Sequence, residues 1–422
     1  RMQPVRTSVY RADASRCKDK IVGMIKVKDK SRCCGCEACV SSCPVQCIDL
    51  VMDKEGFLYP QVDVTRCIDC GKCEKVCPEL VEAGEGKATG VYAAKNPDDE
   101  VRRASSSGGI FTLLAKYVLA ENGVVFGARF DKDWNVVHDY TESKEGLGAF
   151  RGSKYVQSRT GETFKQAERF LKAGRKVLFS GTPCQIMGLK RYLRREYDNL
   201  LTVDFVCHGV PSPLVWRKYI EETLVRQDEK IQFRPTLNHL FSDEMPLIEG
   251  ISFRDKCLGW EKFSFALTLS KVTTGEKNTV SLSSIFYDNA YMQAFLANLT
   301  LRPSCYACPA KCGRSGSDVT LGDFWGIGKI APELDDDRGC SLLIINNPEV
   351  KGKLQKEGCL LAEYSITEVI PYNPSVAYSV DMPNNRNFFW YMFDKAGFHK
   401  ALMLTTNKAF PFWVLRKLFR LL

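Results

Sequence analysis

Cysteine carries the chemistry that this sequence shows most clearly. The spacing Cys-x-x-Cys-x-x-Cys-x-x-x-Cys-Pro occurs twice, starting at Cys33 and again at Cys67. Three closely spaced thiolates on a tight loop can bind three corners of one 4Fe-4S cubane, while the cysteine before proline binds the other cluster. The predicted ligands of the first cluster are Cys33, Cys36, Cys39 and Cys77. The predicted ligands of the second cluster are Cys67, Cys70, Cys73 and Cys43.

The two cysteine segments form an internal repeat. Segments 48–51 and 59–62, between them, have the pattern of short strands, so the region is typical of a bacterial two-cluster ferredoxin with two-fold pseudo-symmetry. Zinc knuckles are the alternative, but they usually use two Cys-x-x-Cys pairs and not two complete segments that each end in Cys-Pro. Cys34 and Cys47 fall outside the spacing and receive no predicted role.

A third array, at Cys305, Cys308 and Cys312, supplies three further ligands. A radical S-adenosylmethionine site would have the opposite order of spacings, so we favour a cubane with one distant cysteine. Cys184 and Cys207 follow predicted strands and are the candidates. We favour Cys184, because the N-terminus of the next helix would stabilise its thiolate. A structural zinc at the array and a catalytic Cys184 are the alternatives.

Small residues at 105–109 precede a predicted helix over 110–120. Backbone N–H groups of such a loop can approach a phosphate or a flavin ring, although serine and glycine are also ordinary helix caps. Residues 151–155, which offer cations and donors, and residues 322–326, which follow a short strand, strengthen the interpretation as a cofactor site. No Gly-x-Gly-x-x-Gly fingerprint occurs, so a Rossmann NAD site is unsupported.

Strand and helix patterns alternate after the ferredoxin-like region. The expected strands are 124–130, 176–180 and 200–207, and the expected helices are 163–173 and 185–196. This order predicts parallel strands joined by crossovers. Residues 250–254 and 263–271 alternate with period two, which predicts an antiparallel portion.

Five motifs follow the double cysteine segment in one order: Ser-Ser-Ser-Gly-Gly-Ile-Phe, Gly-Ser-Lys-Tyr-Val-Gln-Ser, Gly-Thr-Pro-Cys-Gln, Cys-His-Gly-Val-Pro and Gly-Asp-Phe-Trp-Gly. Over about residues 31–345 the chain therefore resembles the beta-subunit family of coenzyme F420 hydrogenases and dehydrogenases. Members are oxidoreductases that contain flavin and iron–sulfur clusters. They include deazaflavin-oxidising subunits of methanogens, plant 7-hydroxymethyl chlorophyll a reductase and bacterial proteins encoded with surface-polysaccharide genes.

The resemblance implies particular cofactor contacts. Those expected for FAD are Ser105, Ser106, Ser107, Gly108, Gly109, Gly152, Ser153, Lys154 and Tyr155. Those expected for a third 4Fe-4S cluster near the flavin are Cys184, Cys305, Cys308 and Cys312.

Patterns and resemblance together predict an α+β protein, in which a bacterial-type two-cluster ferredoxin module precedes a mixed α/β flavin-binding domain. The expected boundaries are a leader or disordered tail at 1–30, the ferredoxin domain at 31–80, a linker at 81–90, the FAD and 4Fe-4S oxidoreductase domain at 91–400 and a basic amphipathic tail at 401–422. A transit peptide is the alternative for the leader. The tail would pack on the protein's own surface or, less favoured, bind a membrane peripherally.

Composition limits the function classes. Nineteen cysteines among 422 residues stand against four histidines, so sites built on imidazole are nearly excluded. The net charge of +9 suggests an acidic partner. Three clusters and one FAD would contribute about −8, so the excess can be their counter-charge and no nucleic-acid partner is expected. No apolar run reaches the roughly 18 residues of a spanning helix, and a cytoplasmic protein is expected.

We therefore expect an iron–sulfur, flavin-dependent oxidoreductase. It would take electrons from a ferredoxin-like donor or a partner redox subunit and act on a small organic substrate or a deazaflavin-type coenzyme. His208, Asp323 and Lys154 are candidates for catalytic proton transfer, and no sequence feature selects among them. The alternative is a non-catalytic electron-transfer subunit or scaffold for a partner enzyme, such as one of surface-polysaccharide biosynthesis.

Overall fold

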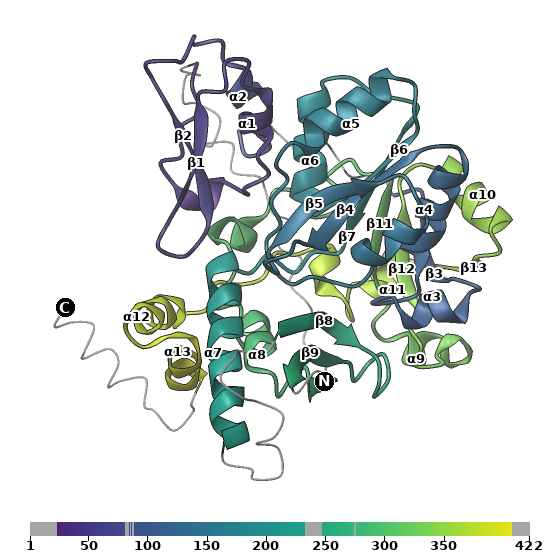
Figure 1. Cartoon of the computed structure of the whole chain (residues 1–422). Coiled ribbons are helices and arrows are strands. Elements are labelled where there is room, and N and C mark those ends of the chain that lie inside the picture. The colour runs from purple at the N-terminus through teal and green to yellow at the C-terminus, as the bar shows by residue number, and fades with distance from the viewer. Residues whose placement is uncertain are drawn as a thin grey trace, which may run out of the picture.

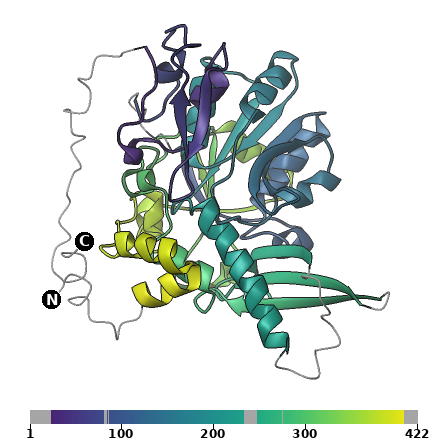
Figure 2. The ribbon, with the colours of Figure 1, turned by 60° about the vertical axis from the view of Figure 1, so that its left-hand side comes forward.

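The computed structural model describes residues 23–80, 84, 86, 88–232, 247–273 and 276–406. Figures 1 and 2 show a small N-terminal module in purple beside a large mixed sheet, with teal-green and yellow elements below both of them. Most of the predicted leader and residues 407–422 of the predicted tail lie outside the described residues. In the described part of the chain, no helix is both long and apolar enough to cross a membrane.

The N-terminal module has the symmetry that its repeat predicts. Strands β1 (Ile48–Met52) and β2 (Leu58–Val62) pair antiparallel, which confirms both predicted strands. Helices α1 (Ala38–Ser42) and α2 (Lys72–Lys75) begin after Glu37 and Gly71, two left-handed residues at equivalent positions of the repeat.

The packed chain begins before residue 31, where the sequence patterns placed the start of the module. Ile25 is buried among cysteines of both cysteine segments, and the 3-10 helix η2 (Lys30–Arg32) follows it. Residues 23–30 therefore belong to the module and not to a leader, because an apolar side chain buried there removes surface from water.

The central sheet has eight strands in the order β13-β3-β12-β11-β7-β6-β4-β5. Their bounds are β3 Gly90–Lys95, β4 Val124–Phe130, β5 Val136–Thr141, β6 Val177–Ser180, β7 Leu200–Phe205, β11 Val319–Asp323, β12 Ser341–Ile345 and β13 Leu360–Tyr364. Strands β4, β6, β7 and β11 are parallel, which confirms the predicted crossovers. Strand β3 has the same direction, because β12 is antiparallel to both β3 and β11.

Helices cover both faces of the central sheet. On one face, α4 (Ile110–Ala120) and α10 (Glu349–Lys356) pack over alternate strand residues. On the opposite face, α5 (Thr163–Lys172) and α6 (Pro183–Leu193) pack near β4 and β6. Helices α9 (Ile327–Ile330) and α11 (Ile366–Val369) cover the same face near β3 and β12. The core is therefore a three-layer α/β/α arrangement.

Helix α6 starts earlier than the predicted helix over 185–196. Thr182 is its N-cap and forms a capping box with Gln185, and Pro183 occupies the first turn. Cys184 therefore lies inside the first turn of the helix and not in the preceding loop. This start is favoured because proline suits the first helical turn and the capping box satisfies its N–H groups.

A second sheet and a group of helices form the rest of the molecule. Strands β8 (Leu247–Asp255), β9 (Ser264–Thr273) and β10 (Glu276–Ile285) are antiparallel, as predicted for the first two. The helices around it are α7 Pro213–Gln232, α8 Ala290–Leu296, α12 Arg386–Ala396 and α13 Phe398–Thr406. Helix α13 crosses the expected boundary at 401, because Ala401 and Leu402 are buried in the core that it shares with α7 and α8.

Candidate iron–sulfur centres and cofactor site

The predicted motifs meet at one edge of the central sheet. Strands β3, β6, β7 and β11 end at this edge, and each leads into a motif. The segments are 105–109, after β3 and the short helix α3 (Asp99–Arg103), 181–184 after β6, 207–209 after β7 and 322–326 at the end of β11. Ligands of open α/β sheets bind outside the carboxyl ends of the strands, so the fold favours one composite site here.

The predicted ligands of the first cluster are close enough to act on one another. Burial raises the pKa of Cys39 well above its usual value, and the charges of Cys33 and Cys77 raise it further. Burial, together with the charge of Cys33, raises the pKa of Cys77 to about 12. Thiols so placed stay protonated at neutral pH unless a metal binds the sulfur. The four cysteines therefore fit a cluster whose iron replaces the protons.

The predicted ligands of the second cluster face solvent on one side. Cys70 is exposed, whereas Cys43 and Cys73 are buried. The amide of Ile25 donates to Cys73 Sγ at 3.3 Å. Cys47, which the spacing left without a role, has its Sγ 3.5 Å from Cys43 Sγ. The second group therefore contains one more sulfur than a cubane needs.

The donor chemistry of both groups fits an iron–sulfur cluster. Among the described residues, no three His, Cys, Asp or Glu side chains converge as ligands of one metal ion. A 4Fe-4S cubane does not require such convergence, because each cysteine binds a different iron. Sets of thiolates without carboxylate ligands favour iron–sulfur chemistry over hard cations.

Polar and steric contacts hold the module against the sheet. Glu37 accepts from Arg159 Nε at 2.6 Å, and Thr160 Oγ1 donates to the carbonyl of Cys36 at 3.1 Å. Gly188 of α6 packs on the same cysteine, since a Cβ at Gly188 would stand 3.0 Å from Cys36 Sγ. The first cluster group is therefore fixed directly to the helix that carries Cys184.

Four cysteines gather at the third site. Burial raises the pKa of Cys305 and of Cys308 to about 12 each, and the charge of Cys184 contributes to both shifts. Burial also raises the pKa of Cys207, with further contributions from Cys305, Cys184 and Cys308. Cys312 is exposed, and its Sγ donates to a backbone carbonyl at 3.1 Å. Both candidates for a fourth ligand therefore lie beside the array, while Cys312 lies at its edge.

Cys34 joins the first cluster group to the third site. Its buried side chain lies in one packed cluster with Cys36 and Cys184, and both neighbouring thiols influence its pKa. The neighbouring Cys34 thiol, followed by burial, raises the pKa of Cys184 well above its usual value. The sequence assigned Cys34 no role, because it lies outside the cluster spacing. The sequence feature that could have pointed to Cys34 is the Cys33-Cys34 doublet, in which a second cysteine directly follows a predicted cluster ligand.

The expected flavin loops meet around Arg254, which the sequence did not single out. Its guanidinium pairs with Asp323, with 2.8 Å between Nη1 and Oδ2, and donates to the carbonyl of Ser106 at 3.2 Å and to the Tyr155 hydroxyl at 3.3 Å. The amide of Ser153 donates to Ser106 Oγ at 2.7 Å. Arg254 therefore connects the loops 105–109 and 152–155 with the motif at 322–326.

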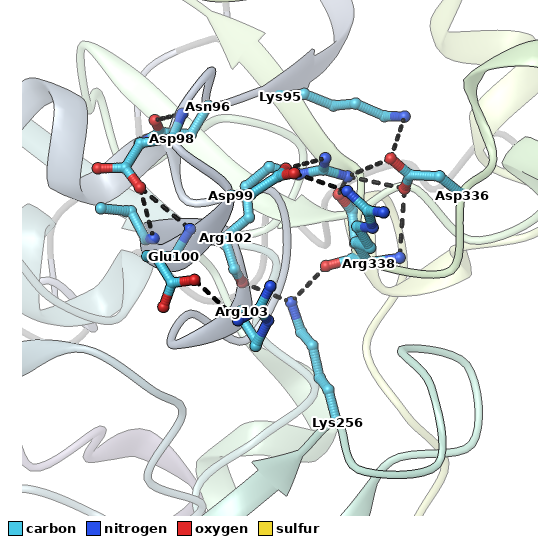
Figure 3. A network of polar contacts seen from close by, with 12 residues as sticks. Lys95, Asn96, Asp98, Asp99, Glu100, Arg102, Arg103, Lys256, Asp336 and Arg338 are labelled. Atoms are coloured by element: carbon cyan, nitrogen blue, oxygen red, sulfur yellow. Dashed lines mark hydrogen bonds and ion pairs between the residues drawn. The ribbon is translucent and has the colours of Figure 1, made fainter.

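Lys256 fixes the serine-rich loop from its other side. Figure 3 shows its Nζ among the carbonyls of Arg102 and Arg338, and a third bond reaches the carbonyl of Ser107 at 2.9 Å. Arg102 in turn donates to Asp336 at 2.7 Å. Burial, followed by the charge of Arg254, lowers the pKa of Lys256 to about 7. The loop is thus supported by two cations, as a site for an anionic group requires.

The three candidate proton-transfer residues have different surroundings. Burial lowers the pKa of Lys154 to about 7, and its Nζ donates to the carbonyls of Arg151 and Gly152. Burial also lowers the pKa of His208, whose Nε2 lies 2.6 Å from the side-chain oxygen of Asn298. Asp323, by contrast, is already engaged by Arg254. Lys154 is therefore the candidate best suited to exchange a proton near neutrality.

A cavity of about 220 Å³ adjoins the third site. It lies on the sheet face between α6 and α11, and Cys207, Lys311 and Cys312 are among its lining residues. Asp204 of β7 also lines it, and burial raises the pKa of this carboxyl to about 6. Its Oδ2 accepts from Ser315 Oγ at 2.5 Å. An apolar cavity with a few polar groups is typical of a small-molecule site.

Comparison with known proteins agrees with this combination of a mixed α/β fold and an N-terminal 4Fe-4S domain. Residues 32–81 match the 4Fe-4S dicluster domain. Residues 91–165 match the N-terminal part of the coenzyme F420 hydrogenase/dehydrogenase beta subunit, and residues 174–363 match its C-terminal part. The chain belongs to the coenzyme F420 hydrogenase/dehydrogenase beta-subunit family, and the resemblance found in its motifs is confirmed.

Individual relatives are more distant. Coenzyme F420-dependent sulfite reductase of Methanocaldococcus jannaschii is 27% identical over 46% of this chain and 30% of the relative. The uncharacterized protein MJ1349 of the same organism is 25% identical over 42% of this chain and 56% of the relative. The chain thus spans about half or less of these relatives. A chain of the F420-reducing [NiFe] hydrogenase complex from Methanosarcina barkeri is 20% identical, with a TM-score of 0.42 over 69% of this chain and 87% of that chain.

The ferredoxin-like part has separate relatives. A 7Fe ferredoxin of Hydrogenibacillus schlegelii is 49% identical over 10% of this chain and 46% of its own length. A ferredoxin of Streptomyces griseus is 43% identical over 13% of this chain and 40% of its own length. These matches support 4Fe-4S binding in the module and an iron–sulfur oxidoreductase type of electron transfer.

Proposed function

We propose that the protein is an iron–sulfur flavoprotein oxidoreductase with three 4Fe-4S clusters and one FAD. Electrons would pass between a ferredoxin-like donor or partner subunit and a small organic substrate or deazaflavin-type coenzyme. The observation that carries the proposal is the packing of Cys184 against the cluster that contains Cys34, which links the ferredoxin-like module to the third cysteine site at the ligand-binding edge of the sheet. This link would connect the module at which electrons enter with the site at which the substrate reacts.

The residues around the expected flavin loops fit an anionic cofactor. Among the described residues, Arg151 Nε and Arg254 Nε are buried donors without a hydrogen-bond partner. Gly109, the N-cap residue of helix α4, has no side chain, so it offers no side-chain acceptor to the first backbone N–H groups of the helix. When bound, FAD would convert electron pairs into single electrons. Ser106, Ser153 and Arg254 would hold it.

The other site residues would position the substrate and supply a proton. Lys154, with a pKa near neutrality, would donate or accept a proton at its Nζ. The cavity beside Cys207 offers apolar walls and the Asp204 carboxyl to a small organic molecule. Asp323 would act through Arg254, by keeping this cation at the serine-rich loop.

Anaerobic purification and reconstitution test the proposal. About twelve iron atoms per chain, equal acid-labile sulfide and one extractable FAD are expected. About eight iron atoms per chain would exclude the third cluster and favour a structural zinc at Cys305, Cys308 and Cys312. Absence of both flavin and sulfide would overturn the proposal. Turnover only in the presence of a co-purified partner would instead identify an electron-transfer subunit, the alternative that membership of a beta-subunit family favours.

A further inference from the structure

Arg302 is a cation buried between the N-terminal module and the rest of the protein. Its exposed fraction is 1%, and it lies three residues before Cys305 of the third site. A buried guanidinium is costly unless other groups hydrogen-bond and neutralise it. The charge partner of Arg302 therefore has to be identified.

The partners of Arg302 point to one ligand of the first cluster. Its Nε donates to the carbonyl of Cys33 at 2.5 Å, and its Nη2 donates to Cys33 Sγ at 3.4 Å. The other contacts are neutral: the guanidinium donates to Gln157 Oε1 at 3.0 Å and to the carbonyl of Leu58 at 2.9 Å. It also lies over the Tyr59 ring, 4.4 Å from the centroid. Within the described residues no carboxylate pairs with it, so the sulfur of Cys33 is its natural anion.

A cation beside a cluster sulfur changes the energy of reduction. Reduction adds one negative charge to a cluster, and a nearby positive charge and an N–H···S hydrogen bond both stabilise that charge. The effect is large where water is excluded, because screening is weak there. Arg302 meets each of these conditions at Cys33. In the described residues, no arginine or lysine contact of this kind reaches the sulfurs of the second group.

We infer that Arg302 raises the reduction potential of the first cluster above that of the second, and so directs electrons inward from the exposed Cys70 side toward Cys34 and Cys184. The inference rests on the proposed clusters at the first two cysteine groups. Arg302 is a positioning and tuning residue in this account. It contacts Cys33, a predicted cluster ligand.

Redox titration of the reconstituted full chain, followed by electron paramagnetic resonance, tests the inference. The variant Arg302→Met removes charge and hydrogen bonds while keeping an apolar side chain of similar length. Its first-cluster midpoint is expected to fall by at least 59 mV, a tenfold change in the one-electron equilibrium, while the second-cluster midpoint stays unchanged. Arg302→Lys, which keeps the charge but loses the planar hydrogen bonds, should show a smaller fall in the same direction.

Gln157→Ala is the matched control. Gln157 donates to the carbonyl of Cys34 and accepts from Arg302, so this variant loses interface hydrogen bonds without losing a charge. Its first-cluster midpoint should move less than that of either arginine variant. An unchanged midpoint in Arg302→Met, or an equal shift in Gln157→Ala, would overturn the inference. If Arg302→Met does not assemble the first cluster, Arg302→Lys decides by the same criterion. A wild-type chain without clusters would instead refute the proposed function.

Discussion

In the first half of the N-terminal module, the cysteines lie against the body of the protein, where Glu37 and Cys36 are bound by Arg159, Thr160 and α6. In the second half, Cys70 is exposed and the neighbouring Ile68 has an exposed fraction of 60%. The same spacing therefore serves two surroundings. Under the proposed function, the first half would pass electrons inward and the second half would receive them from a partner.

The comparison predicts that loss of one ligand has different consequences in the two halves. Cys39→Ser should remove the first cluster, about four iron atoms, and also lower the thermal unfolding temperature, because the cysteine is buried at the docked side. Cys70→Ser should remove a similar amount of iron with a smaller loss of stability. Iron analysis and thermal unfolding measure both. Equal destabilisation by the two variants would contradict the difference between the halves.

Two ion pairs at the turn between β1 and β2 should differ according to their burial. Glu55, between β1 and β2, is buried in a bidentate pair with Arg386 of α12, with Nη1 2.9 Å from Oε1. Arg386→Met should lower the free energy of unfolding by about 3–5 kcal/mol, because it leaves a buried carboxylate unpaired. Lys30→Met, which breaks the more exposed pair with Asp53, should cost about 1 kcal/mol or less. Urea unfolding of both variants measures the two losses in the free energy of unfolding.

A buried carboxyl in the interior of the central sheet should also make the stability depend on pH. The pKa of Asp204 is raised to about 6 in the folded protein, so the native state binds a proton more tightly than the unfolded state. Its contribution to stability is therefore full at low pH and declines as the pH rises from about 4 to about 6. Relative to Asp204→Asn, the wild type should lose about 1 kcal/mol between pH 5 and pH 7, measured by urea unfolding. A constant difference would refute the assignment.

Substitutions in the exposed half should leave the stability of the protein nearly unchanged but should weaken the contact with an electron-donating partner. Ile68→Glu should slow reduction by a bacterial two-cluster ferredoxin several-fold, because it places a charge in an apolar contact worth about 1 kcal/mol. Val225→Glu, at an exposed position of α7, is the control and should leave the rate unchanged. Stopped-flow absorbance measures both rates. Equal slowing would show that electrons do not enter at the second half.

Local patterns were sufficient for most of the fold. The strand at 124–130 and the helix at 110–120 are confirmed, and the strand predicted over 200–207 is present but ends at residue 205, because their apolar periods match the two faces of one sheet. The start of α6 was placed too late, because its capping box begins at Thr182, before the apolar pattern. Residues 23–30 were assigned to a leader, because a basic segment gives no local sign that Ile25 is buried.

The candidate site was predictable only in part. Repeated thiol spacing predicts cluster ligands, because a cubane requires several sulfurs on short loops. Arg254 and Arg302 have no such signature, because their partners lie far away in sequence: Arg254 pairs with Asp323, and Arg302 contacts Cys33. Single arginines in a chain with net charge +9 do not stand out.

The sequence by itself determined the ferredoxin-like module, the alternating α/β pattern and the family, because these depend on residue types at short, regular spacings. The tertiary structure alone decided which cysteine group faces inward, that Cys34 meets Cys184, and that Arg302 lies beside Cys33. These contacts depend on how distant segments pack. Burial then strengthens each charge and hydrogen bond, so cysteine segments of identical spacing come to lie in different electrostatic surroundings.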